Sequence, residues 1–172
     1  KAARVIDNSI ARPMNYITLN RGSRDGVTAN MAVVTPQGTV VGYVMEVSEK
    51  FAVAISILNT EFHTGGKIKG KDSFGSVLWK GTDHTMVTLS EIPRYSDIAV
   101  GDTIVTGYSS IFPEDVMIGT VTGYELTPSA YYEVDVKLAT PMAALRNVFL
   151  VNYADIVERQ LLEEEFGTGS QR

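Results

Sequence analysis

Few residues in this sequence are of the types that carry out acid–base or nucleophilic chemistry. There are two histidines, His63 and His84, and no cysteine. A histidine held between a carboxylate and a hydroxyl is the arrangement that serine hydrolases use. The residues that could complete such a triad are the carboxylates Asp72, Asp83, Asp97 and Asp102 and the hydroxyls Ser73, Ser76 and Ser109.

The surroundings of these residues argue against a catalytic site. None of the serines lies in a Gly-x-Ser-Gly-type segment, which would supply backbone N–H donors for an oxyanion. Both histidines lie in short polar stretches typical of turns, and without a further close ligand they do not compose a zinc site. Segment 22–26 carries glycines but lacks the patterns of a phosphate loop or a dinucleotide fold. The sequence therefore predicts no catalytic residue, metal or cofactor, and a serine hydrolase on a trypsin-like double barrel stays as the enzyme alternative.

Charge and hydropathy narrow the classes of partner. The 172 residues carry a net charge of -5 and contain no run of lysine and arginine. A non-specific nucleic-acid binder needs a basic face to displace phosphate counterions, so nucleic acid is not an expected partner. No apolar stretch approaches the ~20 residues that span a bilayer. Because the sequence begins with Lys1 and not with methionine, we expect a fragment of a longer protein.

The elements that must position any site are short β-strands. Runs rich in Val, Ile, Thr and Tyr recur between Gly, Pro, Asn and Asp, a pattern typical of an all-β protein. The exception is 154–166, where apolar residues among charged ones predict a short amphipathic helix, one that caps a barrel rim in preference to binding a partner, followed by a disordered tail at 167–172. The predicted strands are 4–7, 16–20, 32–35, 40–47, 54–58, 66–68, 76–79, 86–89, 103–106, 117–124, 132–137 and 148–152.

A weak internal repeat indicates two barrels of similar construction. The segment VGYV at 41–44 and the segment IGTV at 118–121 each follow a glycine turn and a strand. Glycine inside a strand often marks a bend, which a small closed barrel needs. We therefore predict two six-stranded barrels at 1–70 and 71–153, divided near 69–73, and leave open whether the last strand returns to complete the first barrel. The residues assigned a structural role in these motifs are Gly22, Asp25, Gly26, Gly42, Gly101, Asp102, Pro113 and Gly119.

Aromatic residues in or beside the predicted loops are candidates for a partner surface. Exposed aromatic side chains are enriched at protein interfaces, because they bury much area for little lost entropy. The alternative, which the sequence leaves open, is that they plug the barrel ends. Aromatic rings gathered on one barrel face would also suit a glycan-binding module. The candidates are Phe62, Tyr95, Tyr108, Phe112, Tyr131 and Tyr132.

Several motifs, taken in order along the chain, resemble the MreC family of rod shape-determining proteins, most closely its Bacteroidetes-type members. The segment NYITLNRGSRDGV at 15–27 resembles the family's NYITLNKGSxDGV, and NMAVV at 30–34 with GTVVG at 38–42 resembles the following strand pair. LWKGTD at 78–83 and IP at 92–93 are similar to its LxWxGxD and IP elements. VGDTIVTG at 100–107, IFPE at 111–114 and IGTV at 118–121 are similar to its GDxVVTSG…FPxGIxIGxV signature, although an extra Ser is lacking and Asp115 replaces a frequent Gly.

The resemblance implies a non-catalytic scaffold. Members of the family are anchored in the inner membrane by an N-terminal helix, dimerise through a coiled coil, and carry a periplasmic pair of β-barrels that is distantly like the trypsin fold but has no triad. They belong to the elongation complex with MreB, MreD, RodA and a class B penicillin-binding transpeptidase, and help to activate peptidoglycan synthesis. The expected partners of this chain are therefore that transpeptidase and its complex, and further copies of the chain in a dimer or filament.

Overall fold

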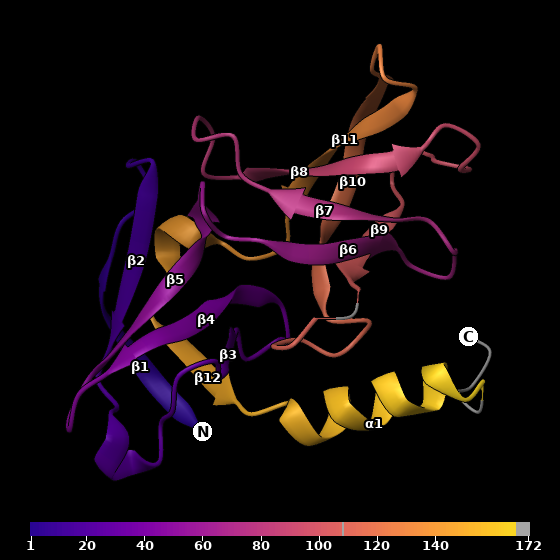
Figure 1. Ribbon diagram of the computed structural model, residues 1–172. Helices are drawn as coiled ribbons and strands as arrows, with labels where there is room; N and C mark the ends of the chain where they lie inside the picture. Colours follow the sequence, from indigo (N-terminus) through magenta and orange to yellow (C-terminus); the bar gives the residue numbers. More distant parts are fainter. Residues whose placement is uncertain (108, 168–172) are drawn as a thin grey trace.

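A computed structural model describes residues 1–107 and 109–167. In this part of the chain, strands form two closed barrels that lie side by side, and the C-terminal helix runs below the second barrel (Figure 1). The all-β class with two six-stranded barrels and a short C-terminal helix is therefore confirmed. The elements are β1 (Ala2–Asn8), β2 (Met14–Leu19), β3 (Ala32–Val34), β4 (Val40–Val47), β5 (Ala52–Asn59), β6 (Thr64–Ile68), β7 (Phe74–Leu78), β8 (Met86–Pro93), β9 (Thr103–Thr106), β10 (Met117–Leu126), β11 (Tyr131–Leu138), β12 (Asn147–Val151) and α1 (Ala154–Glu165), with 3-10 turns at Ser23–Asp25 and Met142–Ala144.

Alternating side chains give each barrel its core. In β2, Ile17 and Leu19 are fully buried, whereas the side chain of Tyr16, which precedes Ile17, is exposed on the outside. In β11, Val134 and Val136 alternate in the same way with residues that face solvent. Successive side chains of a strand point to opposite faces, so each barrel wraps its apolar face inward.

The division between the barrels differs from the one predicted. The first barrel has the strand order β1-β12-β3-β4-β5-β2, and the second has the order β10-β11-β8-β7-β6-β9. The prediction of a boundary near 69–73 is wrong by one strand, because β6 pairs with β7 and β9 in the second barrel. The last strand, β12, returns to pair with β1 and β3 in the first. A strand's own sequence shows that it is a strand, but not which neighbours it will pair with.

The two barrels have the same topology, but each takes one strand, β12 or β6, from the part of the chain that follows the other barrel. Starting from β1, the first barrel reads β1-β12-β3-β4-β5-β2, and starting from β7 the second reads β7-β6-β9-β10-β11-β8. Each of β1 to β5 thus corresponds to the strand six later in the chain. The strand that follows β5 completes the second barrel, and the strand that follows β11 completes the first. Neither barrel can close without a strand that is connected directly to the other.

The repeated glycines lie at corresponding places in this scheme. Gly42 lies in β4 and Gly119 in the equivalent strand β10. A Cβ atom at Gly42 would overlap the backbone carbonyl oxygen of Ile55 on β5, and one at Gly119 would overlap that of Lys137 on β11. Each glycine is therefore needed where two strands approach most closely as the barrel bends.

The turns that precede β3 and β9 are also built alike. The carboxylate of Asp25 accepts a hydrogen bond of 3.0 Å from the N–H of Gly22, and that of Asp102 accepts one of 2.9 Å from the N–H of Ala99. Gly26, which follows Asp25, has φ of 83°, and Gly101, which precedes Asp102, has φ of 95°. Both are left-handed conformations that favour glycine. These motif residues shape the chain before the strand begins.

A buried chain of threonine hydroxyls joins the two barrels. Thr39, in the β3–β4 hairpin of the first barrel, lies 2.7 Å from the hydroxyl of Thr140, which follows β11 of the second. The hydroxyl of Thr140 donates to the carbonyl of Val40 at 2.7 Å, and Thr39 also forms a parallel bridge with Met117 at the start of β10. Because both threonines are buried, these hydrogen bonds are needed to satisfy their hydroxyls and hold the barrels in one arrangement.

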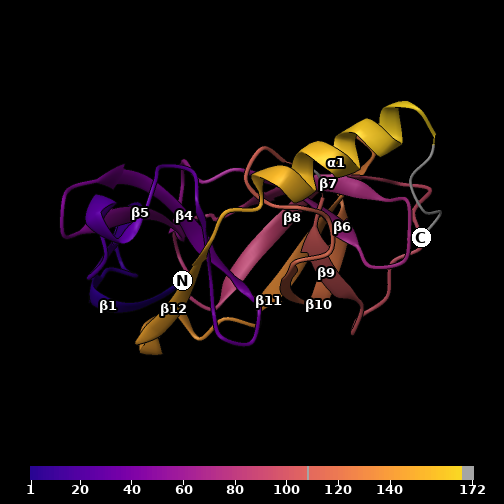
Figure 2. The same cartoon turned by 90° about the horizontal axis from the view of Figure 1, so that it is seen from below.

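Helix α1 leaves β12 of the first barrel and runs along the second, as the view from below shows (Figure 2). Its buried residue is Val157, and the side chain of Gln160 accepts a hydrogen bond from the backbone N–H of Glu114 at 3.1 Å. The helix thus rests on the loop between β9 and β10. No helix within the described residues is long and apolar enough to cross a membrane.

Candidate functional site

The residues considered for a catalytic triad do not come together in the described chain. His63 and His84 are exposed, and no hydrogen bond joins either of them to a serine or an aspartate within residues 1–107 and 109–167. The hydroxyl of Ser109 instead accepts a hydrogen bond of 2.8 Å from the N–H of Phe112, which shapes its loop. In the same part of the chain, no group of three or more His, Cys, Asp and Glu side chains could hold a metal ion.

Asp83, the carboxylate next to His84, serves as a turn cap. It accepts hydrogen bonds from the backbone N–H of Thr85 at 2.8 Å and from the hydroxyl of Thr85 at 2.6 Å. The hydrogen bond from the Thr85 side chain is the main cause that lowers the pKa of the Asp83 carboxyl below its ordinary value. The backbone carbonyl of Asp83 also accepts a 2.8 Å hydrogen bond from the indole of Trp79.

Two of the predicted surface aromatics are core residues. Phe62 and Phe112 are 0% and 1% exposed and rank among the largest fully buried side chains. The prediction that these two belong to a partner surface is therefore wrong, because both rings are buried. Phe62 lies in the linker between the barrels, where its ring packs 5.6 Å from that of Tyr43. A loop position in the sequence does not show that the loop folds inward over an apolar space.

The other predicted aromatics divide differently. Tyr95 is 86% exposed in the turn after β8, and Tyr131 is 46% exposed at the start of β11. Tyr132 is half-buried and meets the ring of Tyr124 edge-on, with 5.6 Å between the ring centres. Tyr108 lies outside the described residues, as does the 168–172 part of the predicted tail.

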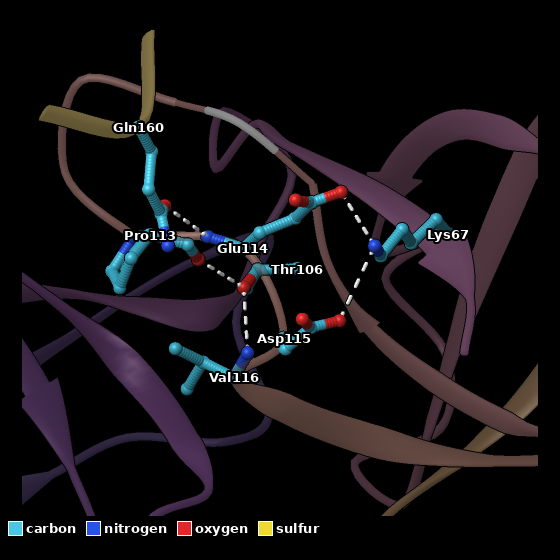
Figure 3. A network of polar contacts seen from close by, with 7 residues as sticks. All are labelled: Lys67, Thr106, Pro113, Glu114, Asp115, Val116 and Gln160. Atoms are coloured by element: carbon cyan, nitrogen blue, oxygen red, sulfur yellow. Dashed lines mark hydrogen bonds and ion pairs between the residues drawn. The ribbon is translucent and has the colours of Figure 1, made fainter. Parts of the chain in front are cut away.

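A buried network of polar contacts holds the loop between β9 and β10, and Figure 3 shows its members converging from four elements. Lys67 on β6 is 8% exposed at its side chain and forms ion pairs with Glu114 at 2.5 Å and Asp115 at 3.3 Å. Thr106, at the end of β9, donates from its hydroxyl to the carbonyl of Pro113 at 2.7 Å and accepts from the N–H of Val116 at 3.0 Å.

This network fixes the loop and the helix together. The side chain of Gln160 on α1 accepts from the N–H of Glu114, the residue whose carboxylate holds Lys67. A buried charge is tolerated only when it is paired, so Lys67 depends on the carboxylates of this loop for its counter-ions. The arrangement determines shape and docks α1, and it brings no nucleophile and base together. Pro113 is the motif residue that takes part in it.

A surface not fully anticipated from the sequence is the hairpin of β10 and β11. The ladder between β9 and β10 ends at Thr120, whereas that between β10 and β11 continues to the pair Leu126–Tyr132. The hairpin therefore extends past β9, and Figure 1 shows it projecting from the end of the second barrel. Tyr124 and Leu126 are 43% and 52% exposed on it. The signal in the sequence is the length of β10, ten residues against four in β9.

A cavity of about 560 Å³ opens between this hairpin and β8. It is the site where β8 and β11 fall out of register, between the pairs Tyr132–Ile92 and Val134–Leu89. Glu91, in the irregular part of β8, has φ of 64°, a left-handed conformation unusual for a residue other than glycine. The lining residues are Ser90, Glu91, Thr127, Ser129, Tyr131, Tyr132 and Glu133.

Comparisons with known proteins agree on one family. The family model described as "Rod shape-determining protein MreC, barrel core" matches residues 5–152. This range contains the whole of β2 to β12 and all of β1 except its first residues. The cell shape-determining protein MreC of Bacillus subtilis is 32% identical over 165 residues, covering 87% of this chain and 56% of the relative. The chain thus spans about half the length of the curated relatives that it matches.

Solved structures show the same architecture. An MreC structure from Listeria monocytogenes superposes with a TM-score of 0.77 at 25% identity, covering 86% of this chain and 72% of that one. A second structure is described as a complex between Penicillin-Binding Protein (PBP2) and MreC from Helicobacter pylori. It has a TM-score of 0.60 and 16% identity, and covers 77% of this chain and 85% of that chain. At that identity the likeness shows the fold alone.

Proposed function

The chain belongs to the MreC family of rod shape-determining proteins, and on this basis we propose that it is a non-catalytic scaffold that binds a penicillin-binding transpeptidase and favours its active conformation. In this role the barrels lie in the periplasm, anchored to the inner membrane by a helix elsewhere in the full-length protein. Further copies of the chain, MreB, MreD and RodA complete the assembly.

The observation that carries the proposal is that the family match extends over both closed barrels. The polar contacts found among their described residues hold loops and strands in place, and no catalytic triad lies among those residues. A protein of the same fold is described in complex with a penicillin-binding protein, which supports the choice of partner class. A scaffold can shift the conformational equilibrium of its partner only by binding one state more tightly, typically by about 1–3 kcal/mol.

We place the contact on the apolar face of the β10–β11 hairpin. Tyr124 lies opposite Val134, and Leu126 lies opposite Tyr132, so these four side chains share one face of the ribbon. Val134 is fully buried inside the barrel, whereas Leu126 is 52% exposed beyond the barrel end. The face therefore continues the barrel core outward into solvent, where a partner can cover it.

Binding of the transpeptidase's periplasmic region to the immobilised chain, measured by biolayer interferometry, tests the proposal. We expect saturable binding, and we expect Leu126→Glu to weaken it about tenfold or more, since a carboxylate would be buried in an apolar contact. Leu162→Glu on α1 is the matched control, because Leu162 is 55% exposed and lies on another surface. Absence of binding by the wild-type chain, with the partner active, would refute the scaffold role.

The enzyme alternative has its own assay. A fluorophosphonate probe labels activated serines, and we expect no labelling of this chain. Labelling at Ser76 or Ser109 would overturn the non-catalytic reading. If this chain binds purified sacculi from which all bound proteins have been removed, a glycan-binding module would be favoured instead.

A further inference from the structure

The outer face of the β10–β11 hairpin carries opposed negative charges. Glu125 on β10 lies directly opposite Glu133 on β11, and Asp135 lies two positions further along on the same face. Like charges in directly opposite positions of an antiparallel pair destabilise the pair. The cost is only partly offset within the described chain, where Glu133 is paired with Lys80 but neither Glu125 nor Glu91 forms an ion pair.

The environment of Lys80 shows that the electrostatic potential beside this face is negative. Lys80 makes an ion pair of 2.9 Å with Glu133. The hydrogen bond to Glu133 is the main cause that raises the pKa of the Lys80 ammonium, and the charges of Glu133, Asp135 and Glu125 raise it further. A cation is thus favoured beside this face, and one lysine neutralises only part of it.

The adjoining cavity combines carboxylates with an aromatic surface. Glu91 and Glu133 both line it, together with Tyr131, which is 46% exposed. Ser90 and Ser129 add hydroxyl groups that can donate or accept. Carboxylates form charge-assisted hydrogen bonds with ammonium and guanidinium groups, and the face of a tyrosine ring attracts the same cations.

The cavity is large enough for a side chain together with part of the segment that carries it. At about 560 Å³ it is within the range of small-ligand sites, and it lies at the irregular pairing of β8 and β11. Irregular pairing of this kind re-aims side chains beside functional sites, and here it places Glu91 in a left-handed conformation on the cavity wall.

We infer that this cavity binds a lysine or arginine side chain presented by a segment of a partner polypeptide, with Glu91 and Glu133 as counter-ions and Tyr131 as the ring that packs against the cation. The inference goes beyond the proposed function, because it concerns the chemistry of a second surface on the hairpin and requires no particular synthase. The apolar face with Leu126 and the acidic face with Glu133 are the two sides of one ribbon.

The test uses the whole chain and two short blocked peptides, Gly-Arg-Gly-Lys-Gly and Gly-Gln-Gly-Gln-Gly. Binding is followed by ¹⁵N–¹H chemical shift changes on titration. We expect the basic peptide to shift the amide signals of Ser90, Glu91, Ser129 and Tyr131, and the neutral peptide to leave them in place. Added salt should weaken the binding, since part of this surface is open to solvent.

Two double variants with the same change of charge separate the effect of the cavity carboxylates on peptide binding from the effect of the chain's net charge. Glu91→Gln with Glu133→Gln should weaken binding of the basic peptide about fivefold or more, the expected loss of two charge-assisted hydrogen bonds. The control, Glu46→Gln with Glu49→Gln, makes the same change of charge on exposed residues of the first barrel and should weaken it less than about twofold. Tyr131→Leu supplies a third variant that keeps an apolar side chain.

Several outcomes would overturn the inference. These are equal binding of the two peptides, shifts confined to other surfaces, equal losses in the two double variants, and no binding of the basic peptide. Binding of chitotetraose at the same amides, without binding of the basic peptide, would assign the cavity to glycan instead. If these results occur while the transpeptidase still binds, the inference fails and the scaffold role stands. The reverse pattern would remove the scaffold role alone.

Discussion

The exchange of β6 and β12 predicts that the two barrels unfold as one unit, and Leu150→Ala tests this directly. Leu150 lies on β12 in the first barrel and is 1% exposed. Removal of its three outer carbon atoms loses about 2.4 kcal/mol of transfer free energy, at about 0.8 kcal/mol for each carbon. The cavity left behind adds to this, so we expect about 3 kcal/mol of lost unfolding free energy.

The chain provides a probe in the other barrel. Trp79, the single tryptophan, follows β7 in the second barrel and is 4% exposed. Because β12 continues from β11, loss of the first barrel releases a strand connected to the second. Urea unfolding followed by Trp79 fluorescence and by far-ultraviolet circular dichroism should therefore give coincident transitions. With a slope of about 2 kcal/mol per molar urea, both midpoints should fall by about 1.5 M.

The control is an exposed leucine. Leu162→Ala on α1 removes the same atoms from a side chain that is 55% exposed, so its effect should stay within about 0.5 kcal/mol. If Leu150→Ala lowers the circular dichroism midpoint but leaves the Trp79 transition in place, the barrels are independent. The reasoning from the strand exchange would then be refuted.

Three further predictions follow from particular contacts. Gly42→Ala should destabilise the fold by about 2 kcal/mol or more in thermal melts, because its Cβ would overlap the carbonyl of Ile55, whereas Gly38→Ala, with φ of 83° and open space, should cost about 1 kcal/mol. Lys67→Met should cost about 3 kcal/mol in urea unfolding, since it leaves two loop carboxylates without their buried cation, and a neutral result would show that the loop is held by its other contacts. Burial raises the pKa of the Tyr43 hydroxyl above 10.0, so the folded chain retains that proton more tightly than the unfolded chain and loses stability as pH rises past about 10. The melting temperature of Tyr43→Phe should fall less steeply over that range, and equal slopes would contradict this assignment.

Much of the fold could be predicted because it depends on local patterns. Every predicted strand overlaps an observed one, and Val40–Val47 and Thr103–Thr106 coincide with the predicted ranges. The strand ends elsewhere differ by a few residues. Pro93, which lies beyond the predicted strand 86–89, is the last residue of β8, where it pairs with Tyr131. A proline is tolerated at the end of a strand, where a lost N–H donor does not interrupt the ladder.

The candidate sites were only partly predictable. Tyr131 was identified from its place beside a loop, and it lines the acidic cavity. Tyr124, Leu126 and Glu91 were not identified, because their importance depends on how far β10 extends past β9 and where β8 falls out of register with β11. Phe62 and Phe112 show the opposite error, since their loops turn inward to fill the interior.

The sequence by itself determined the strands, the glycine turns and the repeated Gly42 and Gly119, because the conformation of each depends on neighbouring residues and on the alternation of apolar side chains. It also carried the family motifs. Only the tertiary structure decided that β6 closes the second barrel and β12 the first, and that Glu91 and Glu133 line one cavity. Strand pairing depends on the free energy of the complete, closed sheet, and the same strand sequence satisfies its local requirements in either barrel.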